Sequence, residues 1–264
     1  MLTRLFPDPL TLAAVQAVVA GLLALLVALL AWWMHLRMEK EIIIALVRGL
    51  LQVIAVGAVL LFIFQGPTAV GFVILAAMMV VAAQMSAKRA QGLPDAFRVS
   101  LYSIAAGSGT IILLMVALGV IDIKLTALIP VGSMLLANSM NTASLAFNRF
   151  RGEVLSHVGH IETALSLGAS PRAAVLPYVQ AAIQASLIPR VDSLRSLGIV
   201  WIPGVMTGML LGGSHPVRAA LYQFVIMAMI LTVSATTSIL AVLLISQRIF
   251  TPAEQLILRS ETEG

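Results

Sequence analysis

Seven stretches of this chain are apolar over lengths that match the thickness of a lipid bilayer. They span residues 11–34, 42–64, 68–85, 99–118, 126–147, 191–212 and 218–246. A helix needs about 20 mainly apolar residues to cross the hydrocarbon core of a membrane. Because a spanning helix satisfies its own backbone hydrogen bonds, the pattern predicts an all-α integral membrane protein with about seven transmembrane helices.

The composition agrees with insertion of the whole chain into a membrane. Charged residues make up 10% of the 264 residues, whereas soluble domains carry roughly 25%. The first stretch is too long for a signal-peptide core, and Trp32-Trp33 stands where a small-residue cleavage site would be, so it is predicted to be a retained span. The net charge of +5 comes mostly from residues beside the apolar stretches, which indicates a bilayer partner and no nucleic acid.

The Lys and Arg residues fall on alternate sides of the predicted spans. Those on one side are Arg37, Lys40, Lys88, Arg89, Arg98, Arg149, Arg151, Arg172, Arg190, Arg195, Arg248 and Arg259. Those on the other side are Arg4, Lys124 and Arg218, and Arg48 lies within the second stretch. Because basic residues gather on the cytoplasmic side, this predicts the N-terminus outside and the C-terminus inside. The chain is expected to be a multi-pass protein of a bacterial inner (cytoplasmic) membrane.

The longest polar gap, residues 148–190, is predicted to be a cytoplasmic coupling segment between spans five and six, within a single membrane domain, 1–264. A helix that begins near Ser156 would stop at Gly168, which Ala169-Ser170-Pro171 follows. Such a short helix with small residues suits docking of another protein, and an ordinary cytoplasmic loop is the alternative. Residues 173–189 are expected to lie along or just below the cytoplasmic surface, since two prolines and two glutamines disfavour an eighth span.

Ionisable and amide side chains occur near the inner ends of two spans. Asp192 and Arg195 are three residues apart on a helix and can pair, and Arg190 precedes them. Arg48 and Gln52 share a face of the second span, and a pairing of Arg48 with Asp192 or Glu162 is a hypothesis. Because charges at membrane depth usually face an interior or a cavity, the set predicts an inner gate or a brace for the coupling helix. Snorkelling of the basic side chains to the interface is the alternative.

Polar side chains inside the fifth and sixth spans are candidates for lining a translocation path. Asn138 and Asn141 share one face of the fifth span. Met206 and Thr207 follow Pro203-Gly204, which predicts a kink or break of the kind that lines sites in transporters. Small and polar residues also hold membrane helices together, so helix packing is the alternative.

Several short runs in the second half of the chain form a recognisable set. They begin with Glu162-x-Ala164-x-x-x-Gly168 and continue with LSLGASP at 165–171, IPRVDS at 188–193, GIVWIPGVMTG at 198–208, HPVRAA at 215–220 and YQ at 222–223. Together they resemble the FetB/YbbM-like (UPF0014) family of ABC transporter permeases, with a likeness from about residue 36 to 250. Thr163 departs from the alanine of the general permease signature, and His215 stands where the family is expected to have aspartate.

The resemblance implies a permease subunit that works as a homodimer with a separate ATP-binding subunit and exports iron. The residues that would couple to that subunit are Glu162, Ala164, Leu167, Gly168, Ala169, Pro171 and Arg172. ATP and magnesium would be bound by the partner, so this chain would hold no cofactor and would not itself be an enzyme. The lysines agree with this, because a phosphate-binding loop needs Gly-Lys-Ser/Thr and none of them follows glycine.

Other functions stay open at this point. The substrate of the same machine could be a non-metal solute such as a nucleotide sugar, and a membrane channel or scaffold would need no ATP coupling. An intramembrane hydrolase is disfavoured, because no histidine and no pair of acids lies mid-span. No metal site is assigned, since the thirteen methionines are explained by apolar packing and the histidines form no cluster.

Overall fold

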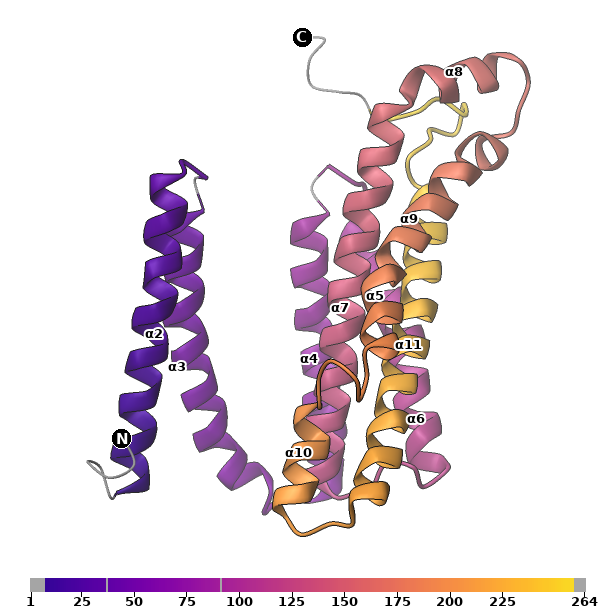
Figure 1. Cartoon of the computed structure of the whole chain (residues 1–264). Coiled ribbons are helices and arrows are strands. Elements are labelled where there is room, and N and C mark those ends of the chain that lie inside the picture. Colours follow the sequence, from indigo (N-terminus) through magenta and orange to yellow (C-terminus); the bar gives the residue numbers. More distant parts are fainter. Residues whose placement is uncertain (1–7, 37, 91, 259–264) are drawn as a thin grey trace. The chain divides into compact units, whose positions relative to one another are not determined.

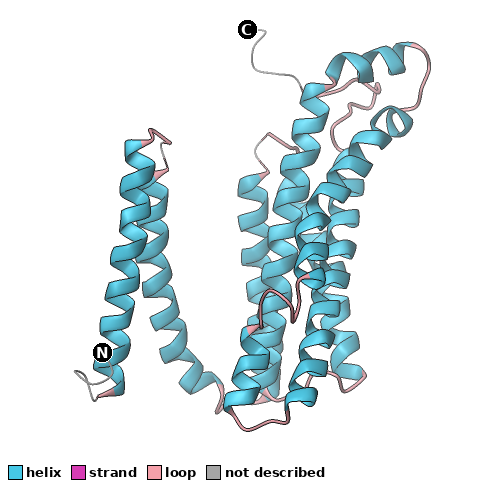
Figure 2. Cartoon of the chain, viewed as in Figure 1, coloured by secondary structure: helices cyan, strands magenta, loops and turns pink. Residues whose placement is uncertain are grey.

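The fold was obtained as a computed structural model, which describes residues 8–36, 38–90 and 92–258. Every regular element in these ranges is a helix, and short loops and turns join the helices (Figure 2). In chain order they are α2 (Pro9–Trp33), α3 (Glu39–Ile63), α4 (Thr68–Arg89), α5 (Ala96–Ile104), the π-helical turn η1 (Ala105–Gly109), α6 (Thr110–Ala117), α7 (Leu125–Ser156), α8 (Val158–Ser166), α9 (Pro171–Arg195), α10 (Gly204–Leu211) and α11 (Pro216–Ser246). The predicted all-α class is confirmed.

The chain divides into two compact units, of which the first is Met1–Gly66. Its helices α2 and α3 pack against each other. Most of their large apolar side chains point outward: Leu22 is 58% exposed and Val53 is 72% exposed. Two helices with so much outward apolar surface need lipid or further membrane helices around them.

The second unit, Pro67–Gly264, is built around α7. Helices α4, α9 and α11 pack along α7, and α11 also contacts α5 and α9 (Figure 1). One buried cluster, which includes Phe150 and Ile161, lies toward α8, and a second includes Leu135 and Ile226. This packing around α7 determines where α8, α9 and α10 are held.

Small residues let the helices around α7 approach closely. Gly132 of α7 faces a leucine of α4, and a Cβ at this glycine would lie 2.8 Å from the leucine side chain. Gly107 of η1 lies so close to Thr237 of α11 that an added Cβ would collide with the Thr237 hydroxyl. Ser139 Oγ lies 2.6 Å from Ser108 Oγ and 3.1 Å from Thr237 Oγ1, so hydrogen bonds join η1, α7 and α11 at this point. Small side chains and interhelical hydroxyl bonds are the usual means of holding membrane helices together.

Five helical stretches among the described residues are long and apolar enough to cross a membrane. They are Thr11–Trp33, Glu39–Leu60, Thr68–Arg89, Ala96–Ala117 and Pro216–Ser246. Each corresponds to a predicted span. The predicted span 126–147 lies within α7, which has the length but a more polar composition because of its asparagines and hydroxyl residues.

The residues predicted to form a helix at the cytoplasmic surface, 173–189, form part of a longer helix. These residues belong to α9, which continues without interruption to Arg195 despite two internal prolines. Val179 and Ala182 are buried, and α9 packs along α7 and α11, while Gln180 and Gln184 are exposed. Burial of the apolar face stabilises α9 enough to outweigh the backbone hydrogen bonds that the prolines remove.

The sixth predicted span, 191–212, is not one helix. Its first residues end α9, its last residues form α10, and a non-helical segment, 196–203, separates them. The break that Pro203-Gly204 predicts is therefore confirmed, and it is wider than a kink. In Figure 1, α10 continues from this segment toward the end of the unit that lies opposite α8.

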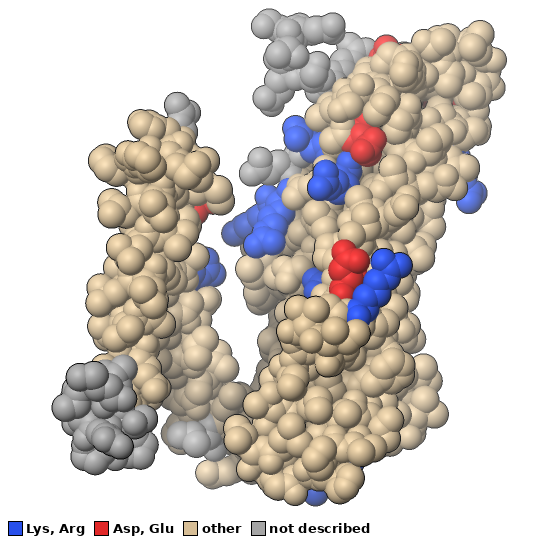
Figure 3. Space-filling model, viewed as in Figure 1, with Lys and Arg blue, Asp and Glu red and all other residues tan. Residues whose placement is uncertain are grey.

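The C-terminal segment lies at the same end of the second unit as α8 (Figure 1). Arg248 Nη1 in this segment is 3.6 Å from Asp95 Oδ2 in the loop before α5, and Leu256 joins the buried cluster that contains Ile161. In Figure 3 the charged side chains of this unit gather over the half nearer α8. This agrees with the predicted clustering of basic gaps on one side, and the assignment of that side to the cytoplasm stays a prediction. Three basic residues of the predicted distribution lie outside the described residues, namely Arg4, Arg37 and Arg259.

We expect Gly107→Val to destabilise the second unit, because the added side chain collides with Thr237. Overpacking of this kind costs about 1–3 kcal/mol. Thermal unfolding of the detergent-purified protein, followed by circular dichroism, should show a lower Tm. The matched control is Gly152→Val on α7, where a Cβ meets nothing within 4 Å. Equal Tm values for the two variants would contradict the close contact between η1 and α11.

Candidate functional site

Helix α8 has one packed face and one open face. Ile161 is fully buried, and Ala164 and Leu165 pack against the same cluster. On the other side Glu162 is exposed, and Leu167, the residue that ends the helix, is 83% exposed. The helix predicted before Gly168 is confirmed, and Glu162 and Leu167 project from the surface that the fold leaves uncovered.

The Ala164-x-x-x-Gly168 spacing of the permease signature coincides with a Schellman motif at the end of α8. The Ala169 amide donates to the Ala164 carbonyl over 3.0 Å, and the Gly168 amide donates to the Leu165 carbonyl over 2.9 Å. These are the two bonds that define the motif, and its fifth residue needs a positive φ. Gly168 has φ +88°, which costs other residues energy but not glycine. The spacing is therefore explained by how the helix ends.

Helix α9 begins immediately after this motif. Ser170 is the N-cap residue, and its Oγ accepts a hydrogen bond of 3.4 Å from the Ala173 amide. Pro171 occupies the first helical position, where a missing N–H costs nothing. Arg172 follows and is exposed. The chain thus turns from α8 into α9 within residues 167–170, and we call this turn the elbow.

The other end of α8 meets α7 at His157. Its φ of −128° interrupts the helix, and its Nδ1 lies 2.8 Å from the Glu153 carbonyl oxygen. The imidazole ring stacks on Tyr178 of α9, with 4.8 Å between ring centroids. Contacts at both ends of α8 therefore hold it between α7 and α9.

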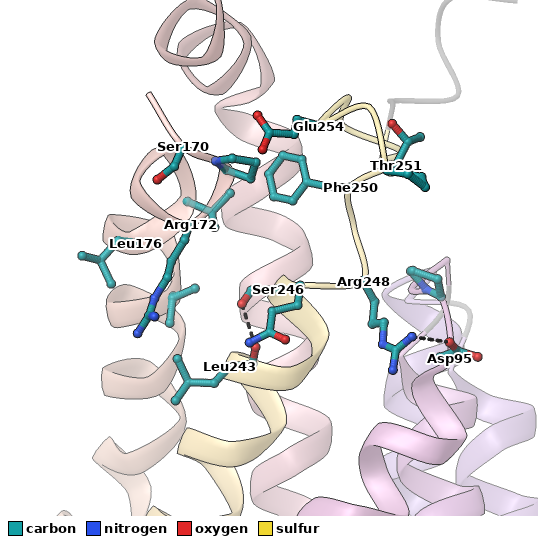
Figure 4. Close-up of a pocket in the computed structure, with 16 residues that line it drawn as sticks. Asp95, Ser170, Arg172, Leu176, Leu243, Ser246, Arg248, Phe250, Thr251 and Glu254 are labelled. Atoms are coloured by element: carbon teal, nitrogen blue, oxygen red, sulfur yellow. Dashed lines mark hydrogen bonds and ion pairs between the residues drawn. The ribbon is translucent and has the colours of Figure 1, made fainter. Parts of the chain in front are cut away.

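A cavity of about 750 Å³ lies beside the elbow (Figure 4). The first turns of α9, the end of α11 and the C-terminal segment line it, with Ser170, Arg172 and Phe250 among the residues. The ion pair between Arg248 and Asp95 crosses its rim. The open face of α8 and this cavity therefore occupy the same end of the unit.

A second cavity, of about 420 Å³, lies where α9 gives way to α10. We call it the break cavity, and its lining includes Asn138, Arg190, Ser193, Trp201, Pro203 and Gln223. Gln223 is buried, and its Oε1 accepts a 3.2 Å hydrogen bond from the Met206 amide in the first turn of α10. Asn138 and Arg190, for which the sequence predicts different roles, both line this cavity.

The remaining predicted residues lie at several places. Asp192 and Arg195 form the expected pair, with 3.9 Å between Oδ1 and Nη1, on an exposed part of α9. Asn141 is exposed, and Thr207 Oγ1 donates to the Pro203 carbonyl over 3.2 Å. Arg48 and Gln52 are exposed residues of α3 in the first unit, so a role with Asp192 stays a prediction.

Sequence reasoning missed Gln223 and Trp201 as members of a site. Trp201 Nε1 donates to Ser196 Oγ over 3.1 Å, which ties the break segment to the end of α9. Gln223 could have been found from the sequence, because a glutamine within an apolar span needs a hydrogen-bond partner when its amide is buried. In the described ranges, no group of three or more His, Asp or Glu side chains is arranged to hold a metal ion.

The helices and their outward apolar surfaces define a multi-pass membrane protein. The sequence model of the "Uncharacterised protein family (UPF0014)" matches residues 14–250. The chain therefore belongs to the UPF0014 family of membrane proteins.

Curated relatives cover most of the chain. "Probable iron export permease protein FetB" of Escherichia coli is 32% identical over 224 residues, which is 84% of this chain and 86% of that protein. "Protein ALUMINUM SENSITIVE 3" of Arabidopsis thaliana is 35% identical over 244 residues, or 92% of this chain and 89% of that protein. "UPF0014 membrane protein STAR2" of rice is 34% identical over 92% of this chain and 84% of its own length. No solved structure matches the chain.

We expect Gly168→Val to loosen the end of α8, because valine is strained at positive φ by about 1–2 kcal/mol. Hydrogen exchange of the Ala169 and Gly168 amides should speed up roughly tenfold, the factor that corresponds to 1.4 kcal/mol. Gly168→Asn should have a smaller effect, since asparagine tolerates this conformation. Gly159→Val in the same helix is the control, because a Cβ there meets nothing within 4 Å. Unchanged exchange in Gly168→Val would show that the motif does not hold the helix end.

Proposed function

We propose that this chain is the membrane subunit of an ABC transporter and that a separate ATP-binding subunit drives it through α8. The observation that carries the proposal is the open face of α8, where Glu162 and Leu167 project beside a rigid helix end. The likeness to permeases supplies the class of partner. The partner holds ATP and magnesium, and closure of the partner pushes on the elbow at Gly168.

Seven crossings agree with this arrangement. Five are the helical stretches named above, α7 is a sixth, and α9 and α10 together make the remaining one. With one crossing shared between α9 and α10, α8 and the C-terminal segment fall on the same side of the membrane. We propose that this side faces the cytoplasm of a bacterial inner membrane, because basic residues lie near both segments.

A homodimer is supported by the charged pair on α9. Asp192 and Arg195 are exposed on the second unit, at 61% and 78% of their side chains. Charged groups at membrane depth avoid lipid and face protein or a water-filled path. A second copy that covers this surface would enclose such a path between the two chains.

Iron export is the activity that the likeness to FetB supports, since FetB is named a probable iron export permease. A second candidate is an anionic organic solute such as a nucleotide sugar. Arg190 in the lining of the break cavity favours it, because a guanidinium attracts anionic oxygens. If the following experiment finds no ATP coupling, the remaining candidates are a membrane channel or a scaffold.

The test is ATP-dependent uptake of iron into inside-out vesicles that contain the chain and its ATP-binding partner. We expect accumulation that stops when the partner cannot hydrolyse ATP. The variant Leu167→Ser combined with Glu162→Lys should lower both partner binding and uptake roughly tenfold or more, as loss of an interface hot spot does.

Leu211→Ser is the matched control for this experiment. Leu211 ends α10 and is 85% exposed, close to the 83% of Leu167, but α10 lies at the end of the unit opposite α8 (Figure 1). If the double variant of Leu167 and Glu162 binds the partner as well as Leu211→Ser does, the role of α8 is contradicted. Intact partner binding and ATP hydrolysis without iron uptake would keep the permease and reject iron as its substrate.

A further inference from the structure

We propose that the break cavity is the substrate site and that it binds a solute through anionic oxygen atoms, of a phosphate or a carboxylate, with Arg190 as the anchoring charge. This inference rests on the proposed permease function and names the chemical class of the substrate. Arg190 is then a substrate-binding residue, whereas its position in the sequence predicts a gate or a brace. The proposal rests on the side chains that lie together where the non-helical segment 196–203 separates α9 from α10.

Arg190 supplies a positive charge whose nearest acid along the chain is engaged elsewhere. It is half-buried, lines the cavity and makes no ion pair within the described residues. Asp192 is two residues further along α9, and residues at that spacing do not share a helix face. The Asp192 carboxylate lies 3.9 Å from Arg195 instead. The charged member of the cavity lining is therefore a cation without a counter-ion.

Two amide side chains in the same lining have N–H groups that can donate hydrogen bonds. Gln223 Oε1 accepts from the Met206 amide, which fixes the amide orientation and leaves the Nε2 hydrogens as donors. Asn138 Nδ2 donates to the Met134 carbonyl over 2.7 Å, and its second N–H remains. A guanidinium together with amide N–H groups matches the acceptor oxygens of a carboxylate or phosphate.

The position and size of the cavity suit a solute on its way across the membrane. Asn138 is thirteen residues along α7 from Leu125, which places it about 20 Å from that end of the helix at 1.5 Å per residue. The cavity lies where one helix of the bundle is broken, as substrate sites of transporters do. A volume of about 420 Å³ accommodates an organic ligand and is larger than a single ion requires.

The charge at this site argues against a bare metal cation as the cargo. A divalent cation in the cavity would meet the Arg190 guanidinium in surroundings of low dielectric, where like charges repel strongly. Iron that passes through this site would therefore be bound to a ligand with anionic oxygens, such as a carboxylate chelator.

Direct binding to the full chain with its ATP-binding partner in lipid nanodiscs tests the proposal. Three labelled probes are compared by equilibrium dialysis: UDP-glucose as a phosphate source, citrate as a carboxylate source and Fe²⁺ alone. We expect one of the anionic probes to bind and Arg190→Gln to weaken its binding roughly tenfold or more, as loss of a charge-assisted hydrogen bond does. Arg190→Lys should retain part of the affinity, because it keeps the charge but not the bidentate geometry. Binding of UDP-glucose would indicate a phosphate ligand, and binding of citrate would indicate a carboxylate ligand.

Arg218→Gln is the control, since Arg218 is an exposed arginine of the same unit at the start of α11. Binding of Fe²⁺ alone that Arg190→Gln leaves unchanged or strengthens, with no binding of either anion, would overturn the proposal. Anion binding that is equal in Arg190→Gln and Arg218→Gln would overturn it as well. ATP hydrolysis and partner retention are measured in the same nanodiscs, so that loss of the permease function and loss of the anion site are recorded separately.

Discussion

A backbone that leaves its helix inside a membrane must find other partners for its N–H and C=O groups. The segment between α9 and α10 satisfies this constraint locally. The Gly198 amide donates to the Trp201 carbonyl over 3.1 Å, and the Val200 amide donates to the Ser196 carbonyl over 3.0 Å. Across the cavity, Gln223 accepts from the first turn of α10. Irregular backbone at membrane depth is tolerated only where protein or a water-filled cavity surrounds it, which is why we propose the substrate site beside this segment.

Helix α9 connects that centre to the surface where the partner is proposed to act. Its 25 residues are about 37 Å long at 1.5 Å per residue. One end is the elbow with α8, and the other end carries Arg190 and opens into the break cavity. Ser186 Oγ of α9 lies 2.6 Å from Ser238 Oγ of α11, and both side chains are buried. This hydrogen bond holds α9 against α11. A displacement of α8 would reach the cavity through this single helix.

Much of this architecture could be predicted from sequence, because apolar length and capping chemistry are local signals. The stop at Gly168 follows from one glycine and its neighbours, and five spans follow from runs of apolar residues. The continuity of α9 could not be predicted in the same way. Pro177 and Pro189 are unfavourable locally, and only packing against α7 and α11 outweighs them.

The break cavity was missed for a related reason. Its lining comes from α7, α9, α10 and α11, so that Asn138 and Gln223 are 85 positions apart in the chain and meet only in the folded unit. The sequence places Arg190 near a membrane interface, where snorkelling is a sufficient explanation. The fold places the same side chain beside two amides, where its charge has a chemical use.

The proposed drive through α8 requires α9 and α10 to cross the membrane together as one span, since this crossing puts α8 on the side where ATP is available. The chain has no cysteine, so single cysteines report position without interference. Ser166 on α8 is exposed and Ser214 in the turn before α11 is partly exposed, so Ser166→Cys and Ser214→Cys can each be tested with a membrane-impermeant maleimide. We expect Ser166→Cys to be labelled only in inside-out vesicles, and Ser214→Cys only in cells whose outer membrane is permeabilised and whose inner membrane is intact. Labelling of both cysteines from the same side would contradict a single crossing and, with it, the drive through α8.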